Sequence, residues 1–170
     1  MRFALVLAVA PAIAIVFDQS ASMTSEKWNE GLNQALSLVV EAPLEDAWLK
    51  VWGFDEGARV WPYGWARLPS KEVRDNVVKW LEETGTGGST DPRPAISKVL
   101  REDKHPLAVV VVTDGMFDVA ALHSRVEVLQ SQRRHRAKIS VVLVGDATEQ
   151  DKVTLRKFTD RNEGWLISRD

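Results

Sequence analysis

Three polar segments of the chain contain side chains that could hold a divalent cation. Asp18, Ser20 and Ser22 alternate directly after an apolar run, and Thr113-Asp114-Gly115 follows a second such run. A third segment, Gly88-Ser89-Thr90-Asp91, combines glycines with hydroxyl and carboxyl groups. The functional atoms are all oxygens, which suit a hard cation such as Mg²⁺. Neutral hydroxyls in direct contact with an ion leave it strongly electrophilic, so such a site would accept one more carboxylate from outside.

Apolar runs precede two of these segments and are typical of buried β-strands. The expected strands cover residues 13–17, 47–54, 107–112, 139–144 and 165–168. Apolar residues at helical spacing predict helices between them, at residues 26–40, 70–81, 94–100, 119–132 and 152–160. Strands that alternate with crossover helices form a mainly parallel sheet covered on both faces. One hairpin strand, at residues 58–61, is expected to be antiparallel.

The carboxyl ends of the strands are where such a sheet binds ligands. Residues 18–22 and 113–115 directly follow strands, and the glycine-rich segment leads into a helix that must start at the same edge. Alternate residues of an extended loop can point the same way, so Asp18, Ser20 and Ser22 are expected to share one side. We therefore expect the carboxylates and hydroxyls to meet at one rim of the sheet.

These segments resemble the metal-ion-dependent adhesion site of von Willebrand factor A domains. The D-x-S-x-S run at residues 18–22 resembles its first element, Thr90 stands in the place of its threonine, and Asp114 in the place of its last acid. The order and length of the elements match over about residues 13–168. The resemblance implies a single von Willebrand factor A-like domain over residues 1–170, with the motif-bearing core at about 12–168. The implied fold is a Rossmann-like three-layer α-β-α arrangement around a mainly parallel sheet with one antiparallel strand.

The resemblance also implies a bound Mg²⁺, with Mn²⁺ or Ca²⁺ as alternatives. Ser20 and Ser22 would ligate directly, Thr90 directly in one state, and Asp18 and Asp114 mainly through water. The implied function is a metal-dependent protein-interaction module, not an enzyme, that binds an Asp or Glu presented by a partner protein. A regulatory or assembly subunit acting beside an ATPase is the alternative function.

Two residues depart from the family pattern. Ala21 stands where glycine is usual, and Asp91 adds a carboxylate beside the threonine position. Asp91 could add negative charge near the ion, but we favour a role in capping the following helix. Because Asp18 and Asp114 are expected at a wet rim, we expect alanine at either position to leave the fold intact.

Each polar segment also has an interpretation without a metal. Residues 18–22 can form a capping loop, and residues 113–115 a common strand-end turn. A glycine-rich loop can hold phosphate at a helix N-terminus, but this one lacks the lysine of a nucleotide-binding loop. The chain has no G-x-S-x-G elbow for a hydrolase nucleophile. A phosphotransfer aspartate at Asp18 is the remote enzymatic alternative, and the hydroxyls of Ser20 and Ser22 argue against it.

The composition narrows the class of protein. The 170 residues are 45% hydrophobic and 27% charged, as expected of one globular domain. The 22 basic and 24 acidic residues give a net charge of −2, which does not support nucleic-acid binding. The chain has no cysteine, so disulfides, thiolate metal sites and cysteine nucleophiles are excluded. The sequence does not predict the oligomeric state.

The N-terminal segment bears on the compartment. Residues 3–17 are apolar after Met1-Arg2, as in a secretory signal, but the run contains Pro11 and is short for a membrane span. Because residues 12–18 resemble a buried strand that ends in an acid, we favour an uncleaved core strand and a cytoplasmic protein. A secreted protein and a truncated chain are the alternatives. No later apolar run is long enough to cross a bilayer.

Further residues of note lie around or away from the expected metal site. Most of the seven tryptophans have core spacing, but Trp61 and Trp65 lie in a loop at the opposite end of the sheet. If exposed, this pair would form a second contact surface. The basic cluster at residues 133–136 is expected to lie at a helix C-terminus. Asp55 and Glu56 are expected on the metal rim, where they would disfavour strongly acidic partners.

Overall fold

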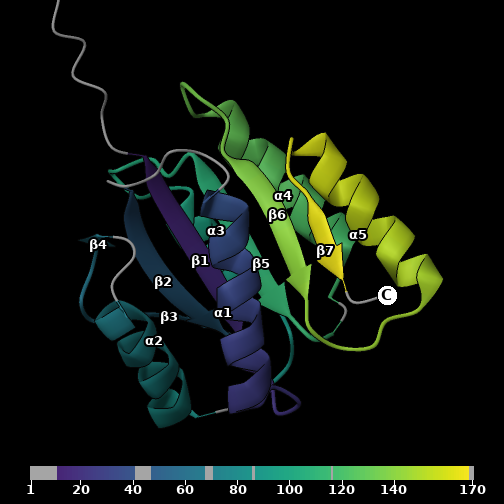
Figure 1. Cartoon of the computed structure of the whole chain (residues 1–170). Helices are drawn as coiled ribbons and strands as arrows, with labels where there is room; N and C mark the ends of the chain where they lie inside the picture. Colours follow the sequence, from purple (N-terminus) through teal and green to yellow (C-terminus); the bar gives the residue numbers. More distant parts are fainter. Residues whose placement is uncertain (1–10, 41–46, 68–70, 86, 116, 169–170) are drawn as a thin grey trace, which may run out of the picture.

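The computed structural model describes residues 11–40, 47–67, 71–85, 87–115 and 117–168. Within these ranges, seven strands form one sheet and five helices pack against it (Figure 1). The strands are β1 (Ala12–Asp18), β2 (Trp48–Phe54), β3 (Ala58–Val60), β4 (Ala66–Arg67), β5 (Ala108–Thr113), β6 (Lys138–Leu143) and β7 (Leu166–Ser168). The helices are α1 (Ser25–Val40), α2 (Lys71–Thr84), α3 (Arg93–Val99), α4 (Val119–Ser131) and α5 (Glu149–Arg161).

Strand β1 lies inside the sheet, between β2 and β5. The strand order is β3-β2-β1-β5-β6-β7, and β4 also pairs with β2. The strands β2, β1, β5, β6 and β7 run parallel to one another. Every residue of β1 is buried, which explains why its sequence is continuously apolar up to the final aspartate instead of alternating. The prediction of a mainly parallel sheet with helices on both faces is confirmed.

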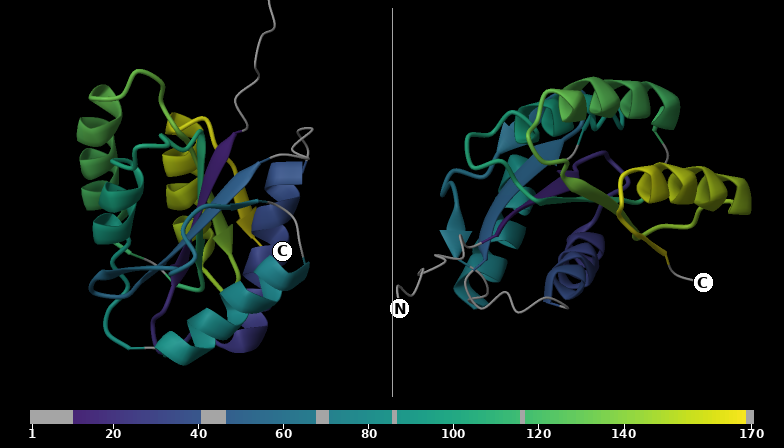
Figure 2. Two further views of the ribbon diagram at one scale, coloured as in Figure 1. Left: turned by 90° about the vertical axis from the view of Figure 1, so that its left-hand side faces the viewer. Right: turned by 90° about the horizontal axis from the view of Figure 1, so that it is seen from above.

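Alternate residues of β1 divide the core into two layers. Ile13, Ile15 and Phe17 belong to the layer formed with α1 and α2. Ala14 and Val16 belong to the opposite layer, formed with α3, α4 and α5. Seen from above in Figure 2, α1 and α4 lie on opposite sides of the sheet. The molecule therefore has the expected three-layer α-β-α arrangement.

The edge of the sheet differs from the prediction of one antiparallel strand. Both β3 and β4 pair with β2 in the antiparallel direction, β3 at the carboxyl end of β2 and β4 at its start. Strand β4 contains only two residues, so it leaves no alternating pattern in the sequence that would reveal it. Together the two short strands cover the open side of β2.

The loop between β3 and β4 does not expose both of its tryptophans, Trp61 and Trp65. Trp61 is only 2% exposed and belongs to the core layer beneath α1 and α2. Its ring contacts that of Tyr63, with the centroids 5.1 Å apart. Trp65 is half-buried, and the Lys50 ammonium lies 5.8 Å from the centre of its ring. A contact surface formed by both tryptophans is therefore excluded, because Trp61 is core.

Two helices are longer than their apolar residues indicate. Helix α2 continues to Thr84, and α5 begins at Glu149, one polar turn before the predicted start. A capping box explains the early start of α5, because the Thr148 and Asp151 side chains each accept a hydrogen bond from the other residue's backbone N–H. The predicted cap at Ser70 lies outside the described residues, as does the possible signal segment at residues 1–10.

The basic cluster at residues 133–136 follows α4, and its first arginine contacts the segment between α3 and β5. The Arg133 guanidinium donates to the backbone carbonyls of Leu100 and Pro106, each at 2.7 Å. The cluster therefore follows a helix C-terminus, as predicted, and Arg133 also binds the C-terminal cap of α3, Leu100. Within the described ranges, no helix is both long and apolar enough to span a membrane.

Candidate functional site

The candidate site lies at the carboxyl end of β1, where the order of the strands in the sheet changes direction. From β1 the sheet extends to β2 on one side and to β5 on the other. Since β1 and β5 are parallel neighbours, their carboxyl ends lie at the same edge. Asp18 is the last residue of β1, and Thr113 is the last residue of β5. The two predicted acidic segments therefore meet at a topological switch point.

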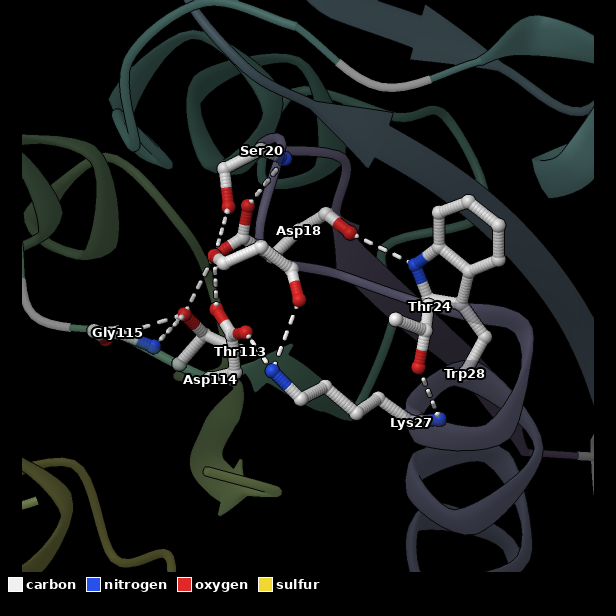
Figure 3. A network of polar contacts seen from close by, with 9 residues as sticks. Asp18, Ser20, Thr24, Lys27, Trp28, Thr113, Asp114 and Gly115 are labelled. Atoms are coloured by element: carbon white, nitrogen blue, oxygen red, sulfur yellow. Dashed lines mark hydrogen bonds and ion pairs between the residues drawn. The ribbon is translucent and has the colours of Figure 1, made fainter. Parts of the chain in front are cut away.

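Asp18 lies behind the site as a fully buried carboxylate. One carboxylate oxygen accepts the Ser20 backbone N–H at 2.8 Å, and the other accepts the Thr113 hydroxyl at 2.6 Å. The Asp18 backbone carbonyl accepts the indole N–H of Trp28 at 2.9 Å (Figure 3). Asp18 thus joins the loop after β1 to the end of β5 and to α1. The expectation that Asp18 lies at a wet rim is wrong, because the residue is buried. The effect of alanine at this position on the fold stays a prediction.

Ser20, Ser22 and Asp114 form a continuous chain of oxygens in front of Asp18. The two serine hydroxyl oxygens are 3.2 Å apart, and the Ser22 hydroxyl donates to one Asp114 carboxylate oxygen at 2.8 Å. Ser20 is buried, whereas Ser22 is exposed. The alternate positions after β1 therefore share one side, as the spacing predicts, and they reach the acid after β5.

The glycine-rich loop that carries Thr90 is bound to the segments that follow β1 and β2. The glycine-rich loop is held at its start by the Gly87 N–H, which donates to the Gln19 carbonyl at 2.9 Å, and at its end by the Asp91 N–H, which donates to the Asp55 carbonyl at 3.0 Å. Within the described residues, no hydrogen bond joins the half-buried Thr90 side chain to Asp18, Ser20, Ser22 or Asp114. The loop is thus attached beside the site, with Thr90 near its C-terminal end.

Asp91 contributes to the start of α3 as expected. One of its carboxylate oxygens accepts the Arg93 backbone N–H at 3.0 Å, and both oxygens bind the Arg93 guanidinium. The hydrogen bonds and charge of Arg93 hold the pKa of Asp91 below its usual value. Pro92 occupies the cap position itself, so Asp91 acts from one residue earlier.

The hairpin acids behave differently from each other. Asp55 is buried and binds the Arg59 guanidinium at 2.6 Å, whereas Glu56 is exposed. Burial alone would raise the pKa of Asp55, but hydrogen bonds from the Gly57 N–H and from Arg59 outweigh it and hold the pKa below its usual value. Asp55 is therefore neutralised by Arg59 and has a structural role. Of the two acids, only Glu56 is still expected to disfavour strongly acidic partners.

Burial is the main electrostatic effect on Asp18. It raises the pKa of the Asp18 carboxyl above the usual 3.8, while hydrogen bonds from Thr113 and Ser20 lower it in part. The neighbouring charge of Asp114 adds to the rise. A buried carboxylate beside a second acid is an environment that favours a nearby cation.

Lys27, in the first turn of α1, is the main site residue that the sequence does not reveal. Its ammonium forms an ion pair with Asp114 (Figure 3) and donates to the Ser22 carbonyl at 2.8 Å. In the sequence Lys27 is an ordinary polar position of an amphipathic helix, and nothing local indicates that it turns back toward the loop. The lysine becomes part of the site only through the packing of α1 against β1 and β5.

Gln19 is a second residue that the sequence does not reveal, because it lies between two predicted ligands. It is fully buried. Its side-chain amide donates to the Thr84 hydroxyl at 2.5 Å, and its oxygen accepts from Arg59 at 3.0 Å. Gln19 thereby fixes the loop after β1 to α2 and β3 and keeps the flanking residues in place.

The capping interpretation of residues 18–22 does not account for their hydroxyls. Thr24 precedes α1, and its hydroxyl accepts the Lys27 N–H at 3.4 Å. The Ser20 and Ser22 hydroxyls instead face each other and Asp114. This donor set of hydroxyl and carboxylate oxygens fits a hard cation. No group of three or more His, Cys, Asp or Glu side chains suited to a metal occurs in the part of the chain that is described, so a cation here would depend on the serines.

Comparison with solved structures agrees with this fold. A von Willebrand factor type A protein from Catenulispora acidiphila is 23% identical, with a TM-score of 0.63, over 94% of this chain and 39% of that one. The PilB minor pilin from Streptococcus sanguinis is 11% identical, with a TM-score of 0.68, over 94% and 57% of the two chains. The manganese-loaded TRAP protein from Plasmodium vivax is 16% identical, with a TM-score of 0.50, over 89% and 61%.

These likenesses support the fold alone, and this chain spans only 39% of the length of the Catenulispora protein. Among curated proteins none matches the chain. The family model for the von Willebrand factor type A domain matches residues 11–166, which is nearly all of the sequence and includes every strand of the sheet but the last residues of β7. The chain therefore belongs to the von Willebrand factor type A domain family.

Proposed function

We propose that the chain is a protein-interaction module that binds a divalent cation, Mg²⁺ in the first place, at the switch point between β1 and β5. The observation that carries this proposal is the chain of oxygens from Ser20 through Ser22 to Asp114, with links of 3.2 and 2.8 Å. Asp18 supports it from behind by holding the Ser20 backbone N–H. Membership in a family of interaction modules agrees with this function, and Mn²⁺ or Ca²⁺ would suit the same oxygens.

In this proposal the residues have distinct roles. Ser20 and Ser22 contact the cation as neutral ligands, and Asp18 and Asp114 act mainly through water. Thr90 joins in the state that binds the partner, because its loop is attached beside the other ligands through Gln19 and Asp55. The bound ion would supply a positive charge that the carboxylate of a partner's Asp or Glu can coordinate. A charge-assisted contact of this kind, partly shielded from water, can carry much of the energy of an interface.

Mg²⁺ titration tests the metal site directly. We expect Mg²⁺ to raise the melting temperature of the wild-type protein and to produce a saturable calorimetric signal. Ser22→Ala, which removes one exposed oxygen of the set, should weaken Mg²⁺ binding by about tenfold or more. Ser124→Ala is the matched control, since Ser124 is an exposed serine on α4 that bonds only its own helix. The metal site would be contradicted by the absence of Mg²⁺ binding, or by equal affinities in wild type and Ser22→Ala.

Peptide binding tests the carboxylate. Peptides selected on the wild-type protein in Mg²⁺ are compared with counterparts in which one Asp is replaced by Asn. We expect an Asp-bearing peptide to bind in Mg²⁺, to dissociate in chelator, and to lose affinity on Asp-to-Asn replacement. Thr90→Ala should weaken peptide binding more than it weakens Mg²⁺ binding. Binding that is equal in Mg²⁺ and in chelator would place the interface elsewhere on the molecule.

A further inference from the structure

Lys27 places a positive charge of the chain itself among the candidate metal ligands. Its ammonium binds one carboxylate oxygen of Asp114, and Ser22 binds the other oxygen at 2.8 Å. The same ammonium donates to the Ser22 backbone carbonyl at 2.8 Å. Figure 3 shows the lysine side chain reaching from α1 across to these oxygens. Lys27 therefore touches two of the residues assigned to the cation.

The other cations near the site already have acidic partners of their own. Arg59 binds Asp55, and Arg93 binds Asp91. The Asp114 side chain is 3% exposed, so it is largely removed from water and is neutralised by Lys27. Among the described residues, Lys27 is the one cation in contact with the Ser20–Ser22–Asp114 chain of oxygens.

We propose that Lys27 is a specificity-determining residue of the site, which competes with the divalent cation for Asp114 and thereby sets how tightly that cation binds. This inference rests on the proposed function. A divalent cation that recruits Asp114, directly or through water, shares that carboxylate with the ammonium, and the two cations repel each other at short range. The lysine can withdraw, because its side chain is 31% exposed and has a flexible four-carbon stem that reaches solvent.

The competition makes the site selective for charge. A monovalent ion carries no more charge than the ammonium and has no electrostatic advantage over it at Asp114. A divalent ion carries twice the charge, and it can bind the hydroxyl oxygens of Ser20 and Ser22 as well. The Lys27 ammonium binds the Asp114 carboxylate and the Ser22 backbone carbonyl and makes neither of these hydroxyl contacts. Lys27 therefore restricts occupancy to divalent cations at concentrations high enough to displace it.

Replacement of Lys27 by methionine tests this inference. We expect Lys27→Met, which keeps the length and apolar stem of the side chain, to lower the calorimetric Kd for Mg²⁺ by about tenfold or more. Lys27→Arg keeps the charge and should keep the Kd close to that of wild type. The matched control is Lys79→Met, since Lys79 is an exposed lysine on α2 with a surface partner, Glu83, at 3.7 Å. Circular dichroism confirms that each variant is folded.

A second measurement does not depend on the metal. In chelator, Lys27→Met should lower the melting temperature, because Asp114 loses its counter-charge, and Asp114→Asn should remove most of that effect. A double-mutant cycle over these two positions measures the interaction energy between the Lys27 and Asp114 side chains. We expect a clear stabilising interaction if the ammonium occupies the carboxylate in the metal-free protein, and none if the contact is incidental. Absence of coupling would overturn the inference.

The outcomes separate the inference from the proposed function. Equal Mg²⁺ affinity of wild type and Lys27→Met would overturn the competition while leaving the metal site intact. Failure of both proteins to bind Mg²⁺ would overturn the proposed function, and the inference with it. Tighter binding in Lys27→Met, with no change in Lys79→Met, would support both.

Discussion

Asp18 connects three elements through one buried side chain and its backbone. It receives hydrogen bonds from Ser20, Thr113 and Trp28, and none of its surface is exposed. Alanine at this position would leave the Ser20 N–H and the Thr113 hydroxyl without their acceptor, which costs about 1–3 kcal/mol for a buried group. We therefore expect Asp18→Ala to destabilise the protein in chelator, in contrast to the neutral effect expected from the sequence.

Asp18 also predicts a pH dependence whose sign follows from its raised pKa. The folded state holds the Asp18 proton more tightly than the unfolded state does. Its contribution to stability is therefore greatest below about pH 3.8, and it is lost as the pH rises through the folded-state pKa. In chelator, wild type should lose stability relative to Asp18→Asn over this window, by up to about 1.4 kcal/mol per pH unit.

Denaturant unfolding of wild type and Asp18→Asn at several pH values measures that difference. Asp75→Asn, at an exposed position on α2, is the control and should follow wild type. A stability difference that is flat over the acidic range, or that grows in favour of wild type, would contradict the buried-carboxylate account.

The residues of the site were predictable where their chemistry is encoded locally. Asp18, Ser20, Ser22 and Asp114 follow strands directly, and the sheet brings them together. Lys27 was not predictable, because its contact with Asp114 crosses 87 residues and depends on how α1 packs. The roles of all these residues toward a cation stay predictions.

The loop that follows β6 packs directly against the end of β5. A Cβ atom on Gly145 would lie 2.6 Å from the Asp114 carbonyl oxygen and 2.9 Å from its Cβ. Neither atom can move without shifting the backbone at Asp114, directly after β5, so we expect Gly145→Ala to cost about 1–3 kcal/mol and to weaken Mg²⁺ binding. Calorimetric melting with and without Mg²⁺ measures both effects.

Gly57→Ala is the control for this substitution. Gly57 lies in the β2–β3 hairpin, where an added Cβ meets nothing closer than 3.9 Å. It should leave both the melting temperature and the Mg²⁺ affinity near wild type. If Gly145→Ala behaved in the same way, the close packing of the two loops would have no energetic role.

The capping box of α5 gives a prediction that is independent of the metal. Thr148 accepts the Asp151 N–H at 3.2 Å and is exposed, so its loss should affect mainly the helix terminus. We expect Thr148→Ala to lower stability by about 1 kcal/mol, which corresponds to about 2–4 °C in melting temperature for a chain of this size. Ser124→Ala, within α4, should change it by less. Equal shifts in the two variants would argue against a capping role.

The elements were predictable in proportion to their length and apolar content. Strands β1, β5 and β6 lie in the interior of the sheet. Both β1 and β5 are continuous apolar runs up to their last residue, and β6 is apolar apart from Lys138 and Ser140, so the sequence alone identifies all three. Strand β4 has two residues and exists only because β2 offers it a hydrogen-bonding edge. The first turn of α5 is polar, and its capping residues, not its hydrophobic pattern, fix where it begins.

The two core layers share the central strands of the sheet. Val110 and Val111 are adjacent in β5, but one belongs to the layer of α1 and the other to the layer of α4. We expect Val110→Ala and Val111→Ala each to lower stability by about 2 kcal/mol and to shift a single unfolding transition. Near- and far-ultraviolet circular dichroism should melt together in both. A variant that loses one signal before the other would show that the layers unfold separately.

The bonds between the ends of β1 and β5 also have a consequence for how the chain folds. The Thr113–Asp18 and Ser22–Asp114 hydrogen bonds join residues 95 and 92 positions apart. Such contacts form only after a long loop has closed, which is slow compared with the formation of a helix. Until β1 and β5 have paired, the nascent chain holds only half of the oxygen set, and a cation would encounter isolated ligands. Ligand binding at this rim should therefore slow the unfolding rate and leave the refolding rate almost unchanged.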